Sequence, residues 1–335
     1  MTERHIPSER NVVAARPELG GGAATPSFAL PDDATSALGP GPGETRIGRR
    51  RFRWGSATFV MGILNVTPDS FSGDGLLLSS GGPGDPAETA VGVAMRMADE
   101  GADLLDIGGE STRPGHDIVS AEEEMRRVVP VVAAVRAALP EMPLSIDTTK
   151  PRVAAAALDA GADLVNDVWG VAEDDALARL AAERSVPLVV MHNRAEARYR
   201  AFMAEVIADL ERALERALAA GCGWEQLLVD PGFGFGKTPE HNLELLRSLS
   251  ALRVLGRPIV LGTSRKSTLG KVLDLPADQR LEATLATTAL AAAAGIDMVR
   301  VHDVRANVRV ARMTDAVVRR AGTGVIARTE ASAGT

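Results

Sequence analysis

Acidic and amide side chains stand at the carboxyl ends of several short apolar runs in this sequence of 335 residues. Asn65 follows one such run, and Asp147, Asn166 and Asp230 lie at the ends of three others. Groups of these types are costly to bury without hydrogen-bond partners. A carboxylate accepts two parallel N–H bonds, whereas an amide both donates and accepts. Such a set suits a flat amino-oxo heterocycle such as a pterin or a purine.

Cationic side chains form a second group at the ends of the apolar runs. They are Arg113, Arg265, Lys266, Arg300 and His302. Their concentration there, in a chain with a formal net charge of −7, indicates a site for an anion such as phosphate or diphosphate. The net charge itself argues against a protein that binds nucleic acid.

Two structural alternatives stay open for these polar groups. Lys266, Arg300 or His192 can pair internally with the buried acidic and amide groups, and the network would then serve the fold alone. Each cation taken singly, Arg265 among them, can also be a surface charge or a salt-bridge partner.

The segment Asp230–Thr238 is rich in glycine and invites comparison with a phosphate-binding loop. Pro231 stands where the pattern Gly-x-x-x-x-Gly-Lys-Thr requires its first glycine, so we reject a nucleoside-triphosphatase function. The glycine spacing also fails the dinucleotide pattern Gly-x-Gly-x-x-Gly. These glycines instead allow the loop to carry Phe233 and Phe235 close to a planar ligand. A role in plugging the core is the alternative for Phe233.

The sequence contains few residues that suit a transition-metal site. His192 and His302 have no second histidine or cysteine at ligand spacing. The single cysteine, Cys222, lies between two glycines and is expected to be a small structural residue. Magnesium needs only a few oxygen ligands together with substrate phosphates, and Asn65 can supply one of them.

The elements that must position these residues alternate along the chain. Short apolar runs lie near residues 59–64, 103–107, 143–146, 163–166, 187–191, 226–229, 258–261 and 297–301. Helical patterns are predicted from a capping box that starts at Ser120, and over 150–160, 173–184, 200–220, 239–254, 278–295 and 305–319. Eight alternations over residues 46–320 predict an α/β fold, a TIM (β/α)₈ barrel, with a doubly wound sheet as the alternative. Residues 47–56 have β character and can form an N-terminal β-hairpin that covers the bottom of the barrel.

The two ends of the chain differ from the centre in composition. Residues 1–45 and 321–335 lack a sustained period and are expected to be disordered tails. No apolar run reaches the roughly 18 residues of a membrane span, and the start does not resemble a secretion signal. We therefore expect a cytoplasmic protein that does not bind a membrane.

Seven segments together resemble the ordered signatures of the dihydropteroate synthase family. They are Met61–Phe71, Gly108–Gly115, Ser145–Lys150, Asn166–Val168, Asp230–Thr238, Ser264–Ser267 and Arg300–Val304. The first is highly specific, and the resemblance covers about residues 46–320. It implies a TIM barrel, usually a homodimer, that condenses 6-hydroxymethyl-7,8-dihydropterin diphosphate with 4-aminobenzoate. The products are 7,8-dihydropteroate and diphosphate.

The resemblance also implies a role for each matching residue. The pterin would be held by Asp147, Asn166, Asp230 and Lys266. The diphosphate and its Mg²⁺ would be bound by Asn65, Arg300 and His302. The aminobenzoate site would be formed or ordered by Thr112, Arg113, Pro114, Phe235, Arg265 and Ser267. Catalysis would rest on Asp147, Lys266, Arg300 and His302, which stabilise charge, with no protein nucleophile.

One departure from the family pattern lies after Phe71. The family commonly shows Ser-Asp-Gly-Gly there, whereas this chain has Ser72-Gly73-Asp74-Gly75 followed by three leucines. A non-catalytic pterin-binding protein is therefore one rival interpretation. The methyltetrahydrofolate-binding barrel of corrinoid methyltransferases is another, although it needs no diphosphate pocket.

Overall fold

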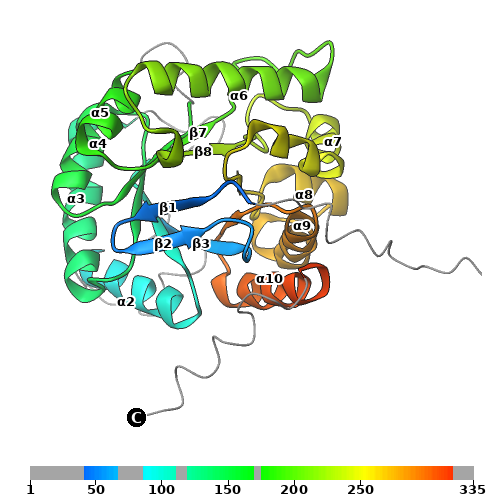
Figure 1. Ribbon diagram of the computed structural model, residues 1–335. Coiled ribbons are helices and arrows are strands. Elements are labelled where there is room, and N and C mark those ends of the chain that lie inside the picture. The colour runs from blue at the N-terminus through cyan, green and yellow to red at the C-terminus, as the bar shows by residue number, and fades with distance from the viewer. Residues whose placement is uncertain (1–40, 67–85, 111–118, 170–174, 320–335) are drawn as a thin grey trace, which may run out of the picture.

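The computed structural model describes residues 41–66, 86–110, 119–169 and 175–319. Eight parallel strands form its central sheet in the order β8-β7-β6-β5-β4-β3-β10-β9. They are β3 (Phe59–Asn65), β4 (Leu104–Gly108), β5 (Leu144–Asp147), β6 (Leu164–Asp167), β7 (Leu188–Met191), β8 (Leu227–Asp230), β9 (Val260–Leu261) and β10 (Met298–Val301). A parallel bridge from Val229 to Ile259 joins the two ends of the sheet. The sheet therefore closes as a barrel, which confirms the predicted fold over the doubly wound alternative (Figure 1).

Helices surround the strands on the outside of the barrel. They are α2 (Pro86–Asp99), α3 (Ala121–Ala138), α4 (Pro151–Asp159), α5 (Ala176–Arg184), α6 (Phe202–Ala219), α7 (Pro239–Arg247), α8 (Ser267–Leu273), α9 (Leu281–Ala293) and α10 (Val304–Val318). Short 3₁₀ turns lie at Trp224–Gln226, Leu249–Leu255 and Ala277–Gln279. In α6, Val206, Leu210 and Leu214 repeat every four residues and are buried, as expected for a helix with one apolar face.

The helix predicted over 239–254 is wrong in its second half. The α-helix ends at Arg247, and the chain continues as a 3₁₀ turn. The Ser248 amide is shared between the carbonyls of Glu244 and Leu245, both at 3.1 Å, so the last turn tightens there. At the predicted start of α3, Ser120 Oγ accepts a hydrogen bond from the Glu123 amide at 3.2 Å. The Glu123 carboxylate pairs with Arg127, so the observed cap is the serine half of the predicted box.

The predicted hairpin closes the amino-terminal end of the barrel. Its strands are β1 (Glu44–Ile47) and β2 (Arg50–Arg53), so the boundary expected at residue 45 falls inside β1. The rings of Phe52, Trp54 and Phe59 pack together with centroids 5.0 to 5.5 Å apart. They join a core inside the barrel that includes Met61, Leu104, Leu164, Val189, Leu228, Val260 and Met298. This end is therefore filled by side chains, which leaves the carboxyl ends of the strands to form a site.

Strand register brings several polar residues to one level at that opposite end. Asn65 pairs with Gly108, Gly108 with Asp147, and Asp147 with Asn166. Asp230 lies beside Met191, further along the same rim. Across the described residues, none of the helices has the length and apolar character that crossing a membrane requires.

Candidate active site

The guanidinium of Arg300 lies at the centre of the site and binds two carboxylates. Its Nε donates to Asp106 Oδ2 at 2.6 Å, and its Nη2 donates to Asp147 Oδ2 at 2.6 Å. Asn166 Nδ2 donates to the same oxygen of Asp106 at 3.1 Å. Four strands, β4, β5, β6 and β10, thus contribute to one network inside the barrel. The internal pairing considered from the sequence therefore exists for Arg300.

This network has more acceptors than donors. Asp106 Oδ1, Asp147 Oδ1 and Ser145 Oγ are buried and have no hydrogen-bond partner in the described part of the chain. Burial raises the pKa of Asp147 to about 7, and the attraction of Arg300 opposes that shift. Burial alone would lower the pKa of Arg300, but the charges of Asp106 and Asp147 outweigh it and raise that pKa. The arrangement suits a ligand that brings N–H donors to the buried oxygens.

Asp230 and Lys266 form a second pair of opposite charges on the rim. Asp230 Oδ1 accepts a hydrogen bond from the Gly232 amide at 2.7 Å. Burial raises the pKa of Asp230, opposed by Lys266, and burial lowers the pKa of Lys266 to about 8, opposed by Asp230. The Lys266 ammonium donates to the Phe233 carbonyl and lies 4.5 Å from the centre of the Phe235 ring. An acceptor, a donor and an aromatic face therefore lie together.

The loop that follows β8 needs its glycines for two reasons. Gly232 and Gly236 have φ of +66° and +53°, which L side chains rarely adopt. A Cβ at Gly232 would lie 1.8 Å from the His192 carbonyl oxygen, so no side chain fits there. Phe233 is fully buried in the core outside the barrel, so it plugs the core. Phe235 stays half-buried on the site side, next to Lys266.

The remaining cationic residues lie near the carboxyl ends of β9 and β10. His302 Nδ1 lies 2.9 Å from Ser264 Oγ, which also accepts from the His302 amide at 3.2 Å. Arg265 forms a two-bond pair with Asp303, at 2.9 and 3.3 Å. The salt-bridge interpretation of Arg265 is therefore correct in this structure. Ser267 is the exposed first residue of α8.

The structure gathers most of the site residues predicted from the sequence. Asp147, Asn166 and Arg300 share one network, and Asp230 contacts the loop that faces Lys266. Asn65 ends β3 and is half-buried, level with Gly108. The predicted residues Thr112, Arg113 and Pro114 lie outside the described residues, as does the altered first loop Ser72–Gly75.

Several polar residues of the site were not predicted. Asp106 is fully buried and binds both Arg300 and Asn166. Its signal was a carboxylate inside the apolar run Leu104–Gly108, since such a group needs a partner. Ser264 and Asp303 hold His302 and Arg265 in place, and only the fold brings these pairs together.

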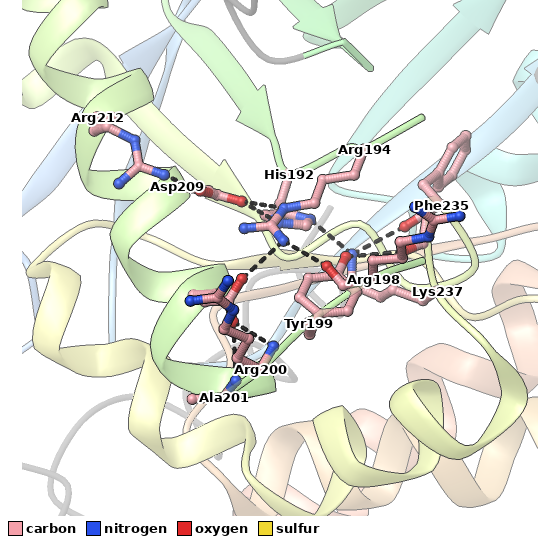
Figure 2. Close-up of polar contacts among 12 residues, drawn as sticks. His192, Arg194, Arg198, Tyr199, Arg200, Ala201, Asp209, Arg212, Phe235 and Lys237 are labelled. Atoms are coloured by element: carbon pink, nitrogen blue, oxygen red, sulfur yellow. Dashed lines mark hydrogen bonds and ion pairs between the residues drawn. The ribbon is translucent and has the colours of Figure 1, made fainter. Parts of the chain in front are cut away.

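Both ring nitrogens of His192 have hydrogen-bond partners from neighbouring side chains. Its Nε2 lies 3.1 Å from Asp209 Oδ2, and its Nδ1 lies 2.8 Å from Lys237 Nζ (Figure 2). Burial, together with the positive charge of Lys237, lowers the pKa of His192 to about 4. Among the described residues, no three His, Cys, Asp or Glu side chains are grouped as a metal site would require.

Comparisons with known proteins agree with this geometry. The family model described as "Pterin binding enzyme" matches residues 61–302. A dihydropteroate synthase of Clostridium beijerinckii is 47% identical over 276 residues, which cover 82% of this chain and 100% of that protein.

Two solved structures are similar over nearly their whole lengths. A dihydropteroate synthase from Clostridium difficile, in the presence of pteroic acid, has a TM-score of 0.75 and is 46% identical, covering 80% of this chain and 100% of that one. The enzyme of Xanthomonas albilineans with 4-aminobenzoic acid has a TM-score of 0.76 and is 42% identical, covering 82% of this chain and 97% of that one. Identity at this level, sustained over a shared barrel, shows that the chain belongs to the dihydropteroate synthase family of pterin-binding enzymes.

Proposed function

We propose a role for each part of the site in the reaction of this family. The protein is a transferase that joins 6-hydroxymethyl-7,8-dihydropterin diphosphate to 4-aminobenzoate and releases diphosphate. The observation that carries our assignment is the set of buried oxygens around Arg300, because a pterin presents N–H donors along one edge. Asp147 Oδ1 and Asp106 Oδ1 accept from that edge, and Asn166 and Asp230 extend the row of polar groups.

The reaction begins when the bond between the pterin methylene and the diphosphate oxygen breaks. The bonding electrons leave with diphosphate, and positive charge spreads into the electron-rich dihydropterin ring. Asp147 and Asp230 stabilise that cation. Hydrogen bonds hold both carboxylates in position before the charge develops. The neutral amine of aminobenzoate then attacks the methylene and loses a proton, so no protein nucleophile is needed.

In this scheme Arg300 acts on the pterin side as well as on the diphosphate, whereas the family resemblance implied only a role in diphosphate binding. Two of its donors bind carboxylates on the pterin side, while its Nη1 makes no hydrogen bond to the described residues. We place Arg300 at the boundary between the ring and the diphosphate. From there it holds Asp147 in position and directs Nη1 toward the leaving group.

At the end of the site that would bind the diphosphate, we assign roles to His302 and to a magnesium ion. Mg²⁺ is commonly held by one or two protein oxygens together with substrate phosphates and water. Asn65 fits that donor set because it ends β3 at the rim and its amide oxygen is a hard ligand. The bound ion would neutralise the departing diphosphate. His302, fixed by Ser264, would donate to a diphosphate oxygen.

The aminobenzoate side is assigned to Phe235, Arg265 and Ser267, whereas Lys266, beside the Phe235 ring, binds the pterin together with Asp230. The paired Arg265 and Asp303 brace the turn before α8, and Ser267 is exposed beside it. Thr112, Arg113 and Pro114 belong to the same proposal through the family resemblance.

A homodimer is part of the proposal, and so is a cytoplasmic location. Exposed apolar side chains occur on α8, α9 and α10, of which α9 and α10 pack against each other. They are Val272 and Leu273 of α8, Leu290 of α9, and Met313 and Val317 of α10, which are between 48% and 66% exposed. Apolar surface of this kind supports a protein partner. Sedimentation of the protein and of a Val317→Glu, Met313→Glu variant tests the dimer, which the double substitution should weaken.

The decisive experiment is a synthase assay with the purified protein. Diphosphate release should require both substrates together with Mg²⁺, and 7,8-dihydropteroate should form in equal amount. Pterin binding without product would support the non-catalytic alternative. Methyl transfer from a methylated tetrahydrofolate, without use of aminobenzoate, would support the corrinoid-methyltransferase alternative.

A further inference from the structure

A chain of three polar side chains lies behind the loop that carries Phe235. Asp209 of α6 binds His192 at the end of β7, and His192 binds Lys237 at the end of the loop. Figure 2 shows the three side chains in line, with Lys237 reaching under the backbone of Phe235. Lys237 Nζ also donates to the Phe235 carbonyl at 3.0 Å. None of the three has a role in the proposed chemistry.

The hydrogen bonds fix the tautomer of His192. The carboxylate of Asp209 only accepts, so His192 Nε2 must carry the proton, and Nδ1 is left to accept from Lys237. Asp209 is itself held by Arg194 Nε at 2.7 Å and by Arg212. Side-chain hydrogen bonds of Asp209 with Arg194 and His192 lower its pKa against the effect of its burial, so it stays ionised at neutral pH. The orientation of each group therefore follows from the next one along the chain.

The charges around Lys237 are nearly balanced. Asp230 at the end of β8 and Asp209 of α6 are negative, whereas Lys266 before α8 and Arg194 in the connection to α6 are positive. His192 after β7 is neutral at pH 7. Burial lowers the pKa of Lys237 to about 7, and Asp230 opposes that shift. Whether charged or neutral, the amine has at least the two N–H donors that His192 and the Phe235 carbonyl require. Both hydrogen bonds can therefore form in either protonation state, although those of the ammonium are stronger.

The loop after β8 connects the Lys237 hydrogen bonds to the active site. Lys237 fixes the Phe235 carbonyl, and Tyr199 Oη donates to the next carbonyl, that of Gly236, at 2.8 Å. The Phe235 ring then lies 4.5 Å from Lys266 Nζ, on the side of the loop that faces the site. We propose that Asp209, His192 and Lys237 are positioning residues that set the Phe235 ring at the aminobenzoate side of the active site. The inference rests on the proposed role of Phe235.

Two substitutions of His192 separate the bonds of this chain. His192→Asn places an amide oxygen near the position of Nδ1 and retains an acceptor for Lys237. His192→Gln places its amide nearer the position of Nε2 and retains a donor for Asp209, but it removes the acceptor for Lys237. Lys237→Met removes the ammonium and retains most of the apolar stem. Arg216→Gln, an exposed residue of α6 one turn beyond Arg212, is the matched surface control.

The steady-state constants for both substrates are the first measurement. We expect Lys237→Met and His192→Gln to raise the KM for aminobenzoate about tenfold and to change the KM for the pterin much less. His192→Asn and Arg216→Gln should stay near the wild-type values. If Phe235→Ala raises the KM for aminobenzoate but Lys237→Met leaves it unchanged, the proposal is overturned. If both His192 variants raise the KM for aminobenzoate equally and lower Tm by similar amounts, the three residues have only a packing role.

Fluorine NMR of 4-fluorophenylalanine in place of Phe235 measures the ring without catalysis. Its resonance should move in Lys237→Met and His192→Gln and hold its place in His192→Asn. A resonance that does not move in any variant overturns the positioning role. A different outcome is a resonance that moves while the KM for aminobenzoate stays constant, both in these variants and in Phe235→Ala. That outcome upholds the positioning of the ring but refutes the proposed function of Phe235.

Discussion

Arg300 Nη2 and Asp147 Oδ2 lie 2.6 Å apart inside the barrel, and this bond organises the pterin side of the site. Two carboxylates share the guanidinium, so the trio carries an excess of negative charge in a buried place once Asp147 is ionised, above about pH 7. An arrangement of this kind is expensive to bury. It becomes useful when a ligand brings N–H donors and develops positive charge beside it.

The first prediction concerns the charge of Asp147. Asp147→Asn conserves shape but removes the charge that stabilises the ring cation, so kcat/KM should fall about 10²- to 10³-fold. Steady-state kinetics with the pterin diphosphate as varied substrate measure the fall. Glu141→Gln, which removes an exposed partner of Arg49, is the control and should leave kcat/KM unchanged. A loss below threefold in Asp147→Asn would remove Asp147 from the catalytic set.

The raised pKa of Asp147 predicts a pH dependence of stability. The folded protein retains a proton on Asp147 up to about pH 7, whereas the unfolded chain releases it near its ordinary pKa of 3.8. The folded state therefore binds more protons between these values, and the free energy of unfolding falls as pH rises through that window. Relative to Asp147→Asn, the wild type should lose stability from about pH 4 to about pH 7 and then level off. Urea unfolding of both proteins at several pH values tests this, and parallel curves would contradict it.

The sequence predicted the barrel because each buried strand is a short apolar run and each helix follows with a helical period. It flagged Asp147, Asn166 and Asp230 because each lies in the last two residues of a strand, where a polar group is conspicuous. Asp106 was missed because it lies in the middle of β4, and only barrel closure turns its side chain toward Arg300. No local pattern could reveal such a contact.

Other features also depended on long-range contacts. His192 and Lys237 are 45 residues apart, and Arg300 and Asp106 are 194 residues apart. The sequence placed His192, Lys237 and Arg300 near strand ends or in a loop. Its periodicity, however, does not indicate which side chains meet. The end of α7 at Arg247 was likewise invisible, because the sequence that follows retains a helical apolar pattern.

Gly234 provides a prediction about the loop itself. It has φ of +86°, and an added Cβ would lie 3.1 Å from Lys266 Cδ. Gly234→Ala should cost about 1–2 kcal/mol of stability from the backbone alone and displace Lys266, which lowers kcat/KM. Gly92→Ala in α2 is the matched control, because nothing lies within 4 Å of its Cβ, and it should stabilise by about 0.5–1 kcal/mol. Urea unfolding and kinetics of the two variants decide the matter, and equal behaviour would refute the strain argument.

Phe52 tests whether the hairpin end of the barrel is separate from the site. It is only 1% exposed, stacks on Trp54 and meets Phe59 edge to face. Phe52→Ala should cost about 3–5 kcal/mol of stability because it leaves a cavity in the barrel core. Well below its Tm, the variant should retain wild-type KM values, since the hairpin fills the end opposite the active site. A change in KM without a change in the free energy of unfolding would contradict this division.

The magnesium assignment depends on Asn65 and can be tested by metal titration. If the Asn65 amide oxygen is a ligand, Asn65→Ala should raise the Mg²⁺ concentration needed for half-maximal activity by about tenfold, and excess Mg²⁺ should restore most of kcat. Asn65→Asp replaces the amide by a carboxylate, which Mg²⁺ prefers, so its requirement should be equal to or lower than that of the wild type. Removal of Mg²⁺ with a chelator should abolish diphosphate release in all three proteins. If Asn65→Ala lowers kcat at every Mg²⁺ concentration without shifting the midpoint, Asn65 contacts the substrate directly and the ion is held by diphosphate and other groups.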